Sequence, residues 1–146
     1  MNKYRHKVNY YETDKMGITH HSNYVRWMEE ARIDYLEQIG LGYRKLEEDG
    51  IISPVIAISC EYKGTTTFDD TVEIEVSVEE FTGIRLVLHY TMVNAADGKL
   101  VMNSRSEHCF VSPEGKPIIL KRSFPELDAR LRELVNKETN IIPDRS

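Results

Sequence analysis

Two periods of hydrophobic residues divide the chain into a helical part and a later, strand-rich part. A short stretch rich in Tyr and Val, residues 6–11, predicts a first strand. From Asn23 onward, apolar residues recur every three or four positions, which predicts a long helix with one apolar face. That face carries Tyr24, Met28, Ala31 and Tyr35. Ser22 or Asn23 is expected to cap this helix and Gly40 to end it, and a shorter helix should follow over residues 43–49.

Beyond Pro54 the period of the apolar residues changes from helical to two. Residues 71–79 alternate without a break, which predicts a half-buried strand with one inward face. That face carries Val72, Ile74, Val76 and Val78. Further strands are expected at 55–63, 84–94 and 100–111, and a last helix at 124–137. Short turn segments separate the strands, so neighbours must run antiparallel, because a parallel crossover needs a dozen or more residues.

The order of these elements predicts an α+β fold of the hotdog type, in which a curled antiparallel sheet wraps around one long helix. A single domain, residues 1–138, accounts for all of them, and residues 139–146 are expected to form a flexible polar tail. A sheet that wraps only one helix leaves a face and edge strands that need cover. We therefore expect a homodimer or a homotetramer.

Composition and charge narrow the classes of function. The net charge of −5 disfavours nucleic acid as a partner, because proteins that bind it usually carry a basic excess. No apolar run is long enough to span a membrane, and the N-terminus has no signal-like stretch, so we expect an unprocessed cytoplasmic protein. Cys60 and Cys109 form no CxxC pair, so we expect buried reduced thiols, no metal site and no redox cofactor.

The residues that can carry chemistry lie in the segment 10–24, YYETDKMGITHHSNY. It places Asp14, Gly17, His20 and His21 directly before the long helix. A carboxylate can attack a carbonyl or activate water, and unpaired amides at a helix start can bind the oxyanion that develops. Gly17 permits a tight loop that brings the two together. This arrangement suits acyl transfer to water.

The same segment resembles the signature of the 4-hydroxybenzoyl-CoA thioesterase-like hotdog family, including its YbgC-type acyl-CoA thioesterase branch. The signature runs roughly Asp-x-Asp-x-x-Gly-x-x-x-His-x-x-Tyr, followed by a helix with Glu-Ala-Arg. The chain matches it at Asp14, Gly17, His21, Tyr24 and Glu30-Ala31-Arg32. Glu12 stands where the family has its first Asp, and the resemblance extends over about residues 5–115. It implies hydrolysis of an acyl-CoA thioester to a carboxylic acid and coenzyme A, with no cofactor.

The resemblance also implies roles for individual residues. Asp14 is expected to act as nucleophile or as general base, and the backbone N–H of His21 as the oxyanion donor. The imidazole of His21 would orient water or the thioester. Gly17 and Tyr24 are expected beside the substrate, with Tyr24 along the acyl pocket.

The residues that hold the coenzyme A phosphates are less directly indicated. Lys63 or Arg85 would meet them, because phosphate groups prefer Lys and Arg. The chain departs from the family here, because it has Lys63-Gly64-Thr65 where relatives often have a Pro. An acyl carrier protein is a second carrier that could deliver the thioester, and the sequence leaves the acyl group itself open.

Several other interpretations stay open from the residues alone. Asp14 could simply cap a turn, as Asp often does. His21 could be an ordinary cap or surface histidine, and His20 is expected in a solvent or packing role. Two other functions also fit the fold: a hotdog enoyl-thioester hydratase, and a non-catalytic acyl-CoA binding protein.

Overall fold

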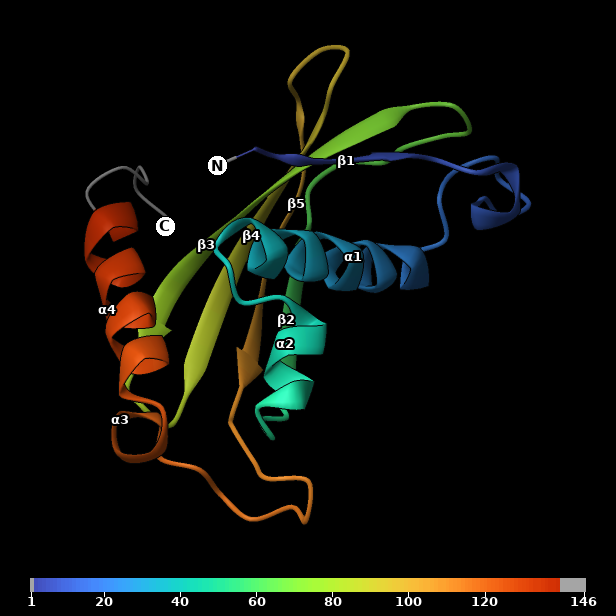
Figure 1. Cartoon of the computed structure of the whole chain (residues 1–146). Coiled ribbons are helices and arrows are strands. Elements are labelled where there is room, and N and C mark those ends of the chain that lie inside the picture. Colours follow the sequence, from blue (N-terminus) through green and yellow to red (C-terminus); the bar gives the residue numbers. More distant parts are fainter. Residues whose placement is uncertain (1, 140–146) are drawn as a thin grey trace. The chain divides into compact units, whose positions relative to one another are not determined.

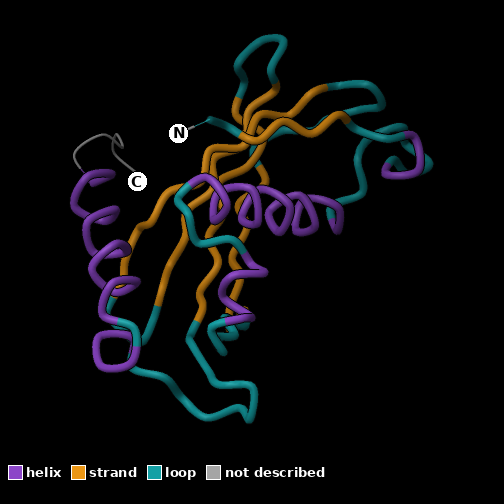
Figure 2. Tube along the Cα trace, in the orientation of Figure 1, coloured by secondary structure: helices purple, strands orange, loops and turns teal. Residues whose placement is uncertain are grey.

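The computed structural model describes residues 2–139, and their side chains as far as residue 135. Residues 140–146, most of the predicted tail, lie outside the described part. The strands are β1 (Tyr4–Lys7), β2 (Val55–Tyr62), β3 (Thr71–Phe81), β4 (Leu86–Asn94) and β5 (Leu100–His108). The helices are α1 (Ser22–Gln38), α2 (Tyr43–Glu48), α3 (Leu120–Ser123) and α4 (Pro125–Thr139), with a 3-10 turn at Tyr10–Glu12 (Figures 1 and 2).

The five strands form one sheet in the order β1-β3-β4-β5-β2. β1 pairs antiparallel with β3, with Tyr4 opposite Ile74 and Lys7 opposite Thr71. The meander from β3 to β5 turns at Gly83 and Gly98, whose φ angles of 95° and 72° favour glycine. β1 and β2 therefore form the two edges of the sheet.

Within this chain two compact units can be distinguished, and their boundaries fall inside strands. The first unit contains the residues up to Tyr43, Cys60–Val76 and Tyr90–Ser104. The second contains Arg44–Ser59, Ser77–His89 and the residues from Arg105 onward. Each unit has its own buried apolar residues and is described by itself below.

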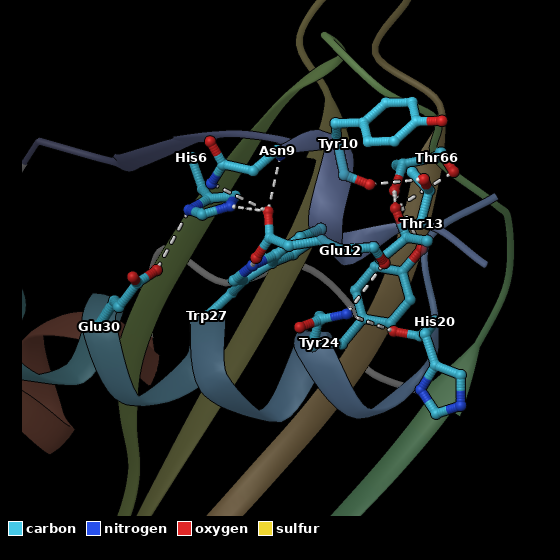
Figure 3. A network of polar contacts seen from close by, with 12 residues as sticks. His6, Asn9, Tyr10, Glu12, Thr13, His20, Tyr24, Trp27, Glu30 and Thr66 are labelled. Atoms are coloured by element: carbon cyan, nitrogen blue, oxygen red, sulfur yellow. Dashed lines mark hydrogen bonds and ion pairs between the residues drawn. The ribbon is translucent and has the colours of Figure 1, made fainter. Parts of the chain in front are cut away.

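The first unit is built around α1. The predicted apolar face of this helix is buried, and Trp27 adds to it. The buried set in this unit includes Tyr24, Trp27, Met28, Ala31, Tyr35, Val72, Ile74, Tyr90, Met92 and Met102. The end of β2 also packs on α1, since the sulfur atoms of Cys60 and Met28 lie 4.0 Å apart. Figure 3 shows α1 lying across the strands at its N-terminal end.

The second unit gathers its buried side chains from α2, α4, the second half of β3, the start of β4 and the segment after β5. They include Leu46, Val78, Phe81, Leu86, Leu88, Phe110, Leu127, Leu131 and Leu134. The buried Asp128 accepts a hydrogen bond of 2.7 Å from Nε of Arg132, whose guanidinium lies 5.3 Å from the ring centre of Phe81. Arg132 therefore connects the first turns of α4 to Phe81 at the end of β3.

Most predicted elements are found, and the differences have local causes. The predicted strand at 6–11 ends at Lys7, because Asn9 and Glu12 form a reciprocal capping box that bends the chain into a 3-10 turn. Helix α1 starts at Ser22 with His21 in the cap position, so neither Ser22 nor Asn23 caps it. Its predicted end is confirmed, with Gly40 at a φ of 82°.

Smaller differences concern the strands and the cysteines. Along β3, Val72, Ile74 and Val78 are buried as predicted, but Val76 is only half-buried and Ser77 is buried, so the alternation is interrupted at this point. Helix α3 lies in a stretch for which no helix was predicted. Cys60 and Cys109 are free thiols, but both are half-buried rather than fully buried. None of the helices in residues 2–139 is both long and apolar enough to cross a membrane.

Candidate active site

The segment before α1 folds into a short β-hairpin, residues 12–20. The amide of Asp14 donates to the carbonyl of Ile18 at 2.8 Å, and the amide of His20 donates to the carbonyl of Glu12 at 2.8 Å. Thr13 and Thr19 form a bridge between these two pairs. Gly17 closes the turn with a φ of 80°, a left-handed conformation that favours glycine. The hairpin carries Asp14 on one arm, and its other arm continues directly into α1.

The carboxylate of Asp14 is half-buried at the tip of this hairpin. Its Oδ1 accepts a hydrogen bond of 2.8 Å from the amide of Met16. This is the turn-capping contact that the sequence left open. Oδ1 therefore holds the turn, whereas the described residues supply no hydrogen-bond donor to the other oxygen, Oδ2.

His21 stands at the N-terminal end of α1 in a helical conformation, with φ −56° and ψ −27°. Within residues 2–139 no acceptor is found for its amide N–H. Its exposed ring lies 4.4 Å from the ring of His20 and 6.3 Å from that of Tyr62. The ring of His20 is also exposed, and its Nδ1 forms a hydrogen bond of 2.8 Å with the hydroxyl of the nearby Ser22.

Tyr24 is buried, and its hydroxyl belongs to a small network. It lies 3.1 Å from the hydroxyl of Thr66, which lies 2.6 Å from the hydroxyl of Thr19. The amide of Thr19 also donates to the carbonyl of Thr66 at 2.8 Å. Thr67 adds a bond of 2.8 Å from its hydroxyl to the carbonyl of Gly17. These contacts hold the second arm of the hairpin against the segment before β3.

The first arm of the hairpin is held by a residue that sequence reasoning did not select, Glu12. Its carboxylate is 5% exposed and meets Nε2 of His6 at 2.9 Å and the indole N–H of Trp27 at 2.7 Å (Figure 3). Asn9 donates to it from its backbone amide at 2.8 Å and from its side chain at 3.2 Å. Burial alone would raise the pKa of Glu12, but these donors and the nearby His6 outweigh it and lower that pKa.

The surroundings of Glu12 extend the network to β1 and further along α1. The second ring nitrogen of His6 lies 3.2 Å from a carboxylate oxygen of Glu30, and its ring lies 4.4 Å from that of Trp27. Trp27 packs edge-on against Tyr24 at 4.9 Å. In the sequence, the only signal for Glu12 was its place in the motif, where it replaces an Asp.

The two cations predicted to bind phosphate are both paired with carboxylates. Lys63 lies in the first unit, and its ammonium is 3.2 Å from Glu61. Arg85 lies in the second unit, bonded to Glu107 and, at 2.8 Å, to Glu80. The bond to Glu107, with the charges of both carboxylates, raises the pKa of Arg85. Across residues 2–139, no cluster of three or more His, Cys, Asp or Glu gathers in a way that could hold a metal ion.

Comparison with known proteins identifies the family. The family model described as "Thioesterase-like superfamily" matches residues 8–133, which include the whole hairpin and α1. The chain belongs to this superfamily. The chain is also similar to "Putative acyl-CoA thioesterase YneP" of Bacillus subtilis, with 36% identity over 82% of this chain and 87% of that protein.

Solved structures agree with this assignment. The crystal structure of the DHNA-CoA thioesterase from Staphylococcus aureus superimposes with a TM-score of 0.89 and 30% identity, covering 98% of this chain and 96% of that one. A hypothetical protein of Aquifex aeolicus gives a TM-score of 0.78 with 33% identity over 86% of this chain and 97% of that one. The superfamily and the α+β hotdog fold predicted from the sequence are therefore confirmed.

Proposed function

We propose that this protein hydrolyses an acyl-CoA thioester to a carboxylic acid and coenzyme A, with Asp14 as the reacting carboxylate. The observation that carries the proposal is the hairpin, because it connects the carboxylate of Asp14 to the N-terminal end of α1. Among the described residues, Oδ2 of Asp14 has no donor and the amide of His21 has no acceptor. Membership of the superfamily supports it, as do the relatives named acyl-CoA thioesterase and DHNA-CoA thioesterase. The YbgC-type branch is part of this proposal.

Two routes use the same groups. In the first, a carboxylate oxygen of Asp14 attacks the thioester carbonyl, the carbon–sulfur bond breaks, and coenzyme A leaves as a thiolate that takes up a proton. Water then hydrolyses the mixed anhydride and restores the carboxylate. In the second, Asp14 takes a proton from water as that water attacks the carbonyl; the carbon–sulfur bond then breaks, and the departing thiolate takes up the proton. In both, the N–H of His21 and the positive end of α1 stabilise the oxyanion.

The substrate contacts follow from the same geometry. Gly17 places the turn, and the ring of Tyr24 would contribute to the wall of the acyl pocket while its hydroxyl stays bonded to Thr66. Lys63 or Arg85 would bind coenzyme A phosphates after exchanging a carboxylate partner for the ligand. For exposed pairs such an exchange costs little, because water and salt screen surface ion pairs. An acyl carrier protein remains the alternative carrier, and the cytoplasm the proposed compartment.

We also propose that the protein acts as a homodimer or homotetramer. β2 is an edge strand, and it exposes Val55, Ile56 and Ile58 together with its unpaired backbone groups. Such an edge invites pairing with a second strand. A second copy of the chain would cover it.

The decisive experiment replaces Asp14 by Asn and measures free thiol release from a panel of short, branched, aromatic and long acyl-CoA substrates. We expect Asp14→Asn to lower kcat at least 100-fold on the best substrate, about the loss typical of a key catalytic group. The fold should be retained, since an amide oxygen can still accept from Met16. Unchanged turnover would remove Asp14 from the mechanism, and formation of a 3-hydroxyacyl product from an enoyl-CoA would point to a hydratase instead.

A second experiment separates the two routes. A single turnover in heavy-oxygen water, followed by rapid quenching, should place label in the carboxylate of Asp14 if the mixed anhydride forms and water attacks its enzyme carbonyl. It should place label only in the released acid if Asp14 is a general base. Mass spectrometry of the peptide that contains Asp14 decides between them.

A further inference from the structure

The carboxylate of Glu12 is buried, bonded at both oxygens and unused by the mechanism above. It is 5% exposed, and four donor groups lie within hydrogen-bond distance of its two oxygens. Oε1 meets His6 and both nitrogens of Asn9, and Oε2 accepts from the indole of Trp27, so each oxygen has at least one partner. A buried charge is tolerated only when it is bonded in this way, because an unpaired one is costly.

The four donors come from three different elements. His6 belongs to β1, Asn9 precedes the 3-10 turn, and Trp27 lies in the second turn of α1. Figure 3 shows the carboxylate of Glu12 beside the rings of His6 and Trp27, whose ring centres are 4.4 Å apart. One side chain therefore joins the edge strand, the turn and the helix.

The backbone of Glu12 makes the same connection at the helix start. Its carbonyl accepts from the amide of His20 at 2.8 Å and from the side-chain amide of Asn23 at 3.0 Å. Asp14 follows two residues later on the same arm, and His21 follows His20 on the other arm. Residue 12 thus stands at the base of the hairpin, where the two arms and α1 meet.

We propose that Glu12 is a positioning residue, whose carboxylate fixes the Asp14 hairpin onto the first turns of α1 and so keeps Asp14 and the His21 amide in reach of one thioester group. This inference rests on the proposed function. Glu12 itself touches no substrate, and it acts through the placement of Asp14. Its lowered pKa agrees with a carboxylate that is held in its charged form.

The variant Glu12→Gln tests the carboxylate with almost no change of shape. The side-chain amide of Gln has one oxygen, which accepts, and one nitrogen, which donates. In either orientation the nitrogen must face a donor, which is the indole N–H of Trp27 in one case and the N–H groups of Asn9 in the other. One of these contacts is lost, and the hairpin can shift on α1. A displacement of about 1 Å can cost about 100-fold in rate.

We expect Glu12→Gln to lower kcat about 10- to 100-fold while KM changes less than about twofold. The control is Asp128→Asn, which also converts a buried carboxylate to an amide. One oxygen of Asp128 accepts from Arg132 on α4, and the other has no hydrogen-bond partner among the described residues. This variant should keep kcat within about twofold, whatever stability it loses. Unchanged kcat in Glu12→Gln, or an equal loss of kcat in Asp128→Asn, would overturn the proposal.

A double-mutant cycle shows whether Glu12 acts through Asp14. In the Asp14→Asn background, measured in single turnovers with excess enzyme, Glu12→Gln should change the residual rate less than about twofold. The same fold-change in both backgrounds would mean that Glu12 acts independently of Asp14. Normal turnover in Asp14→Asn alone would instead refute the proposed function, so the two failures are distinguishable.

A milder variant keeps the test valid if Glu12→Gln does not fold. Trp27→Phe removes a single donor and retains a ring that packs between His6 and Tyr24. It should lower kcat about threefold or more at unchanged KM. A folded Trp27→Phe enzyme with the kcat of the unaltered protein would count against the proposal.

Discussion

At the scale of single residues, the hairpin depends on a few backbone and side-chain features. Gly17 adopts a φ of 80°, and a Cβ at that position would meet no atom within 4 Å. Any penalty for a larger residue therefore comes from the backbone conformation and not from a clash. This makes the turn beside Asp14 sensitive to a single methyl group.

Gly17→Ala should lower the free energy of unfolding by about 1–2 kcal/mol, the cost of a left-handed residue with a Cβ. If the turn relaxes, Asp14 moves, and kcat should fall as well. Gly98→Ala is the control, because its φ of 72° and its open surroundings are similar and it lies in the β4–β5 turn. Urea denaturation and thiol release measure both effects. An equal fall of kcat in both variants would disprove the specific role of Gly17.

Glu12 gives a prediction about pH at the same scale. Because folding lowers its pKa below the ordinary value of 4.5, its contribution to stability is present above that pH and is lost as the pH falls through the lower value of the folded protein. The free-energy gap between the unaltered protein and Glu12→Gln should therefore shrink as the pH falls below about 4.5. Urea denaturation at a series of pH values measures the gap, and a gap that does not shrink at any pH below 4.5 would contradict the prediction.

At the scale of elements, the regular segments were predictable because a local pattern defines them. The apolar face of α1 and the alternation in β3 each repeat over many positions, so the period was informative. The 3-10 turn was not predictable, because Tyr10 and Tyr11 are good strand residues and only the contacts of Glu12 with His6 and Trp27 favour the bend. The motif alone was enough to select Asp14 and His21 as site residues. The role of Glu12 could be recognised only from its contacts in the folded protein.

The second arm of the hairpin provides a prediction about this element. Thr66→Val removes the hydroxyl that lies between those of Thr19 and Tyr24, and all three are buried. It should cost about 1–3 kcal/mol, because buried hydroxyls lose their partner. Thr67→Val removes an exposed bond to Gly17 and should cost less than about 0.5 kcal/mol. If urea denaturation gave the same loss of unfolding free energy for both variants, the buried network would add no more stability than the exposed bond.

At the scale of the whole molecule, the proposed assembly depends on the edge strand β2. Val55, Ile56 and Ile58 are exposed along this strand, whose outer backbone groups have no strand beside them in the sheet order. Natural proteins usually protect such an edge or pair it. Dimer formation was expected from the sequence only in general terms, because the pattern of apolar residues does not show which strand forms the edge.

Ile56→Lys should shift the protein towards monomer, because it places a charge in the proposed contact. Ile84→Lys is the matched control, since both isoleucines are 54% exposed but Ile84 lies in the turn between β3 and β4. Light scattering after size exclusion measures the mass. The unaltered protein and Ile84→Lys should be at least dimers. A monomeric unaltered protein would refute the assembly, and a dimeric Ile56→Lys would move the interface away from β2.

The indole of Trp27 gives the molecule an optical reporter. It is the one tryptophan in the sequence, and its N–H is bonded to the carboxylate of Glu12. Indole emission is sensitive to such a bond and to a neighbouring charge, so the tryptophan component of the intrinsic fluorescence reports on the place where hairpin and helix join. Titration with a non-hydrolysable thioester analogue, followed by that emission, would show whether ligand binding changes the surroundings of Trp27. No attached dye is needed.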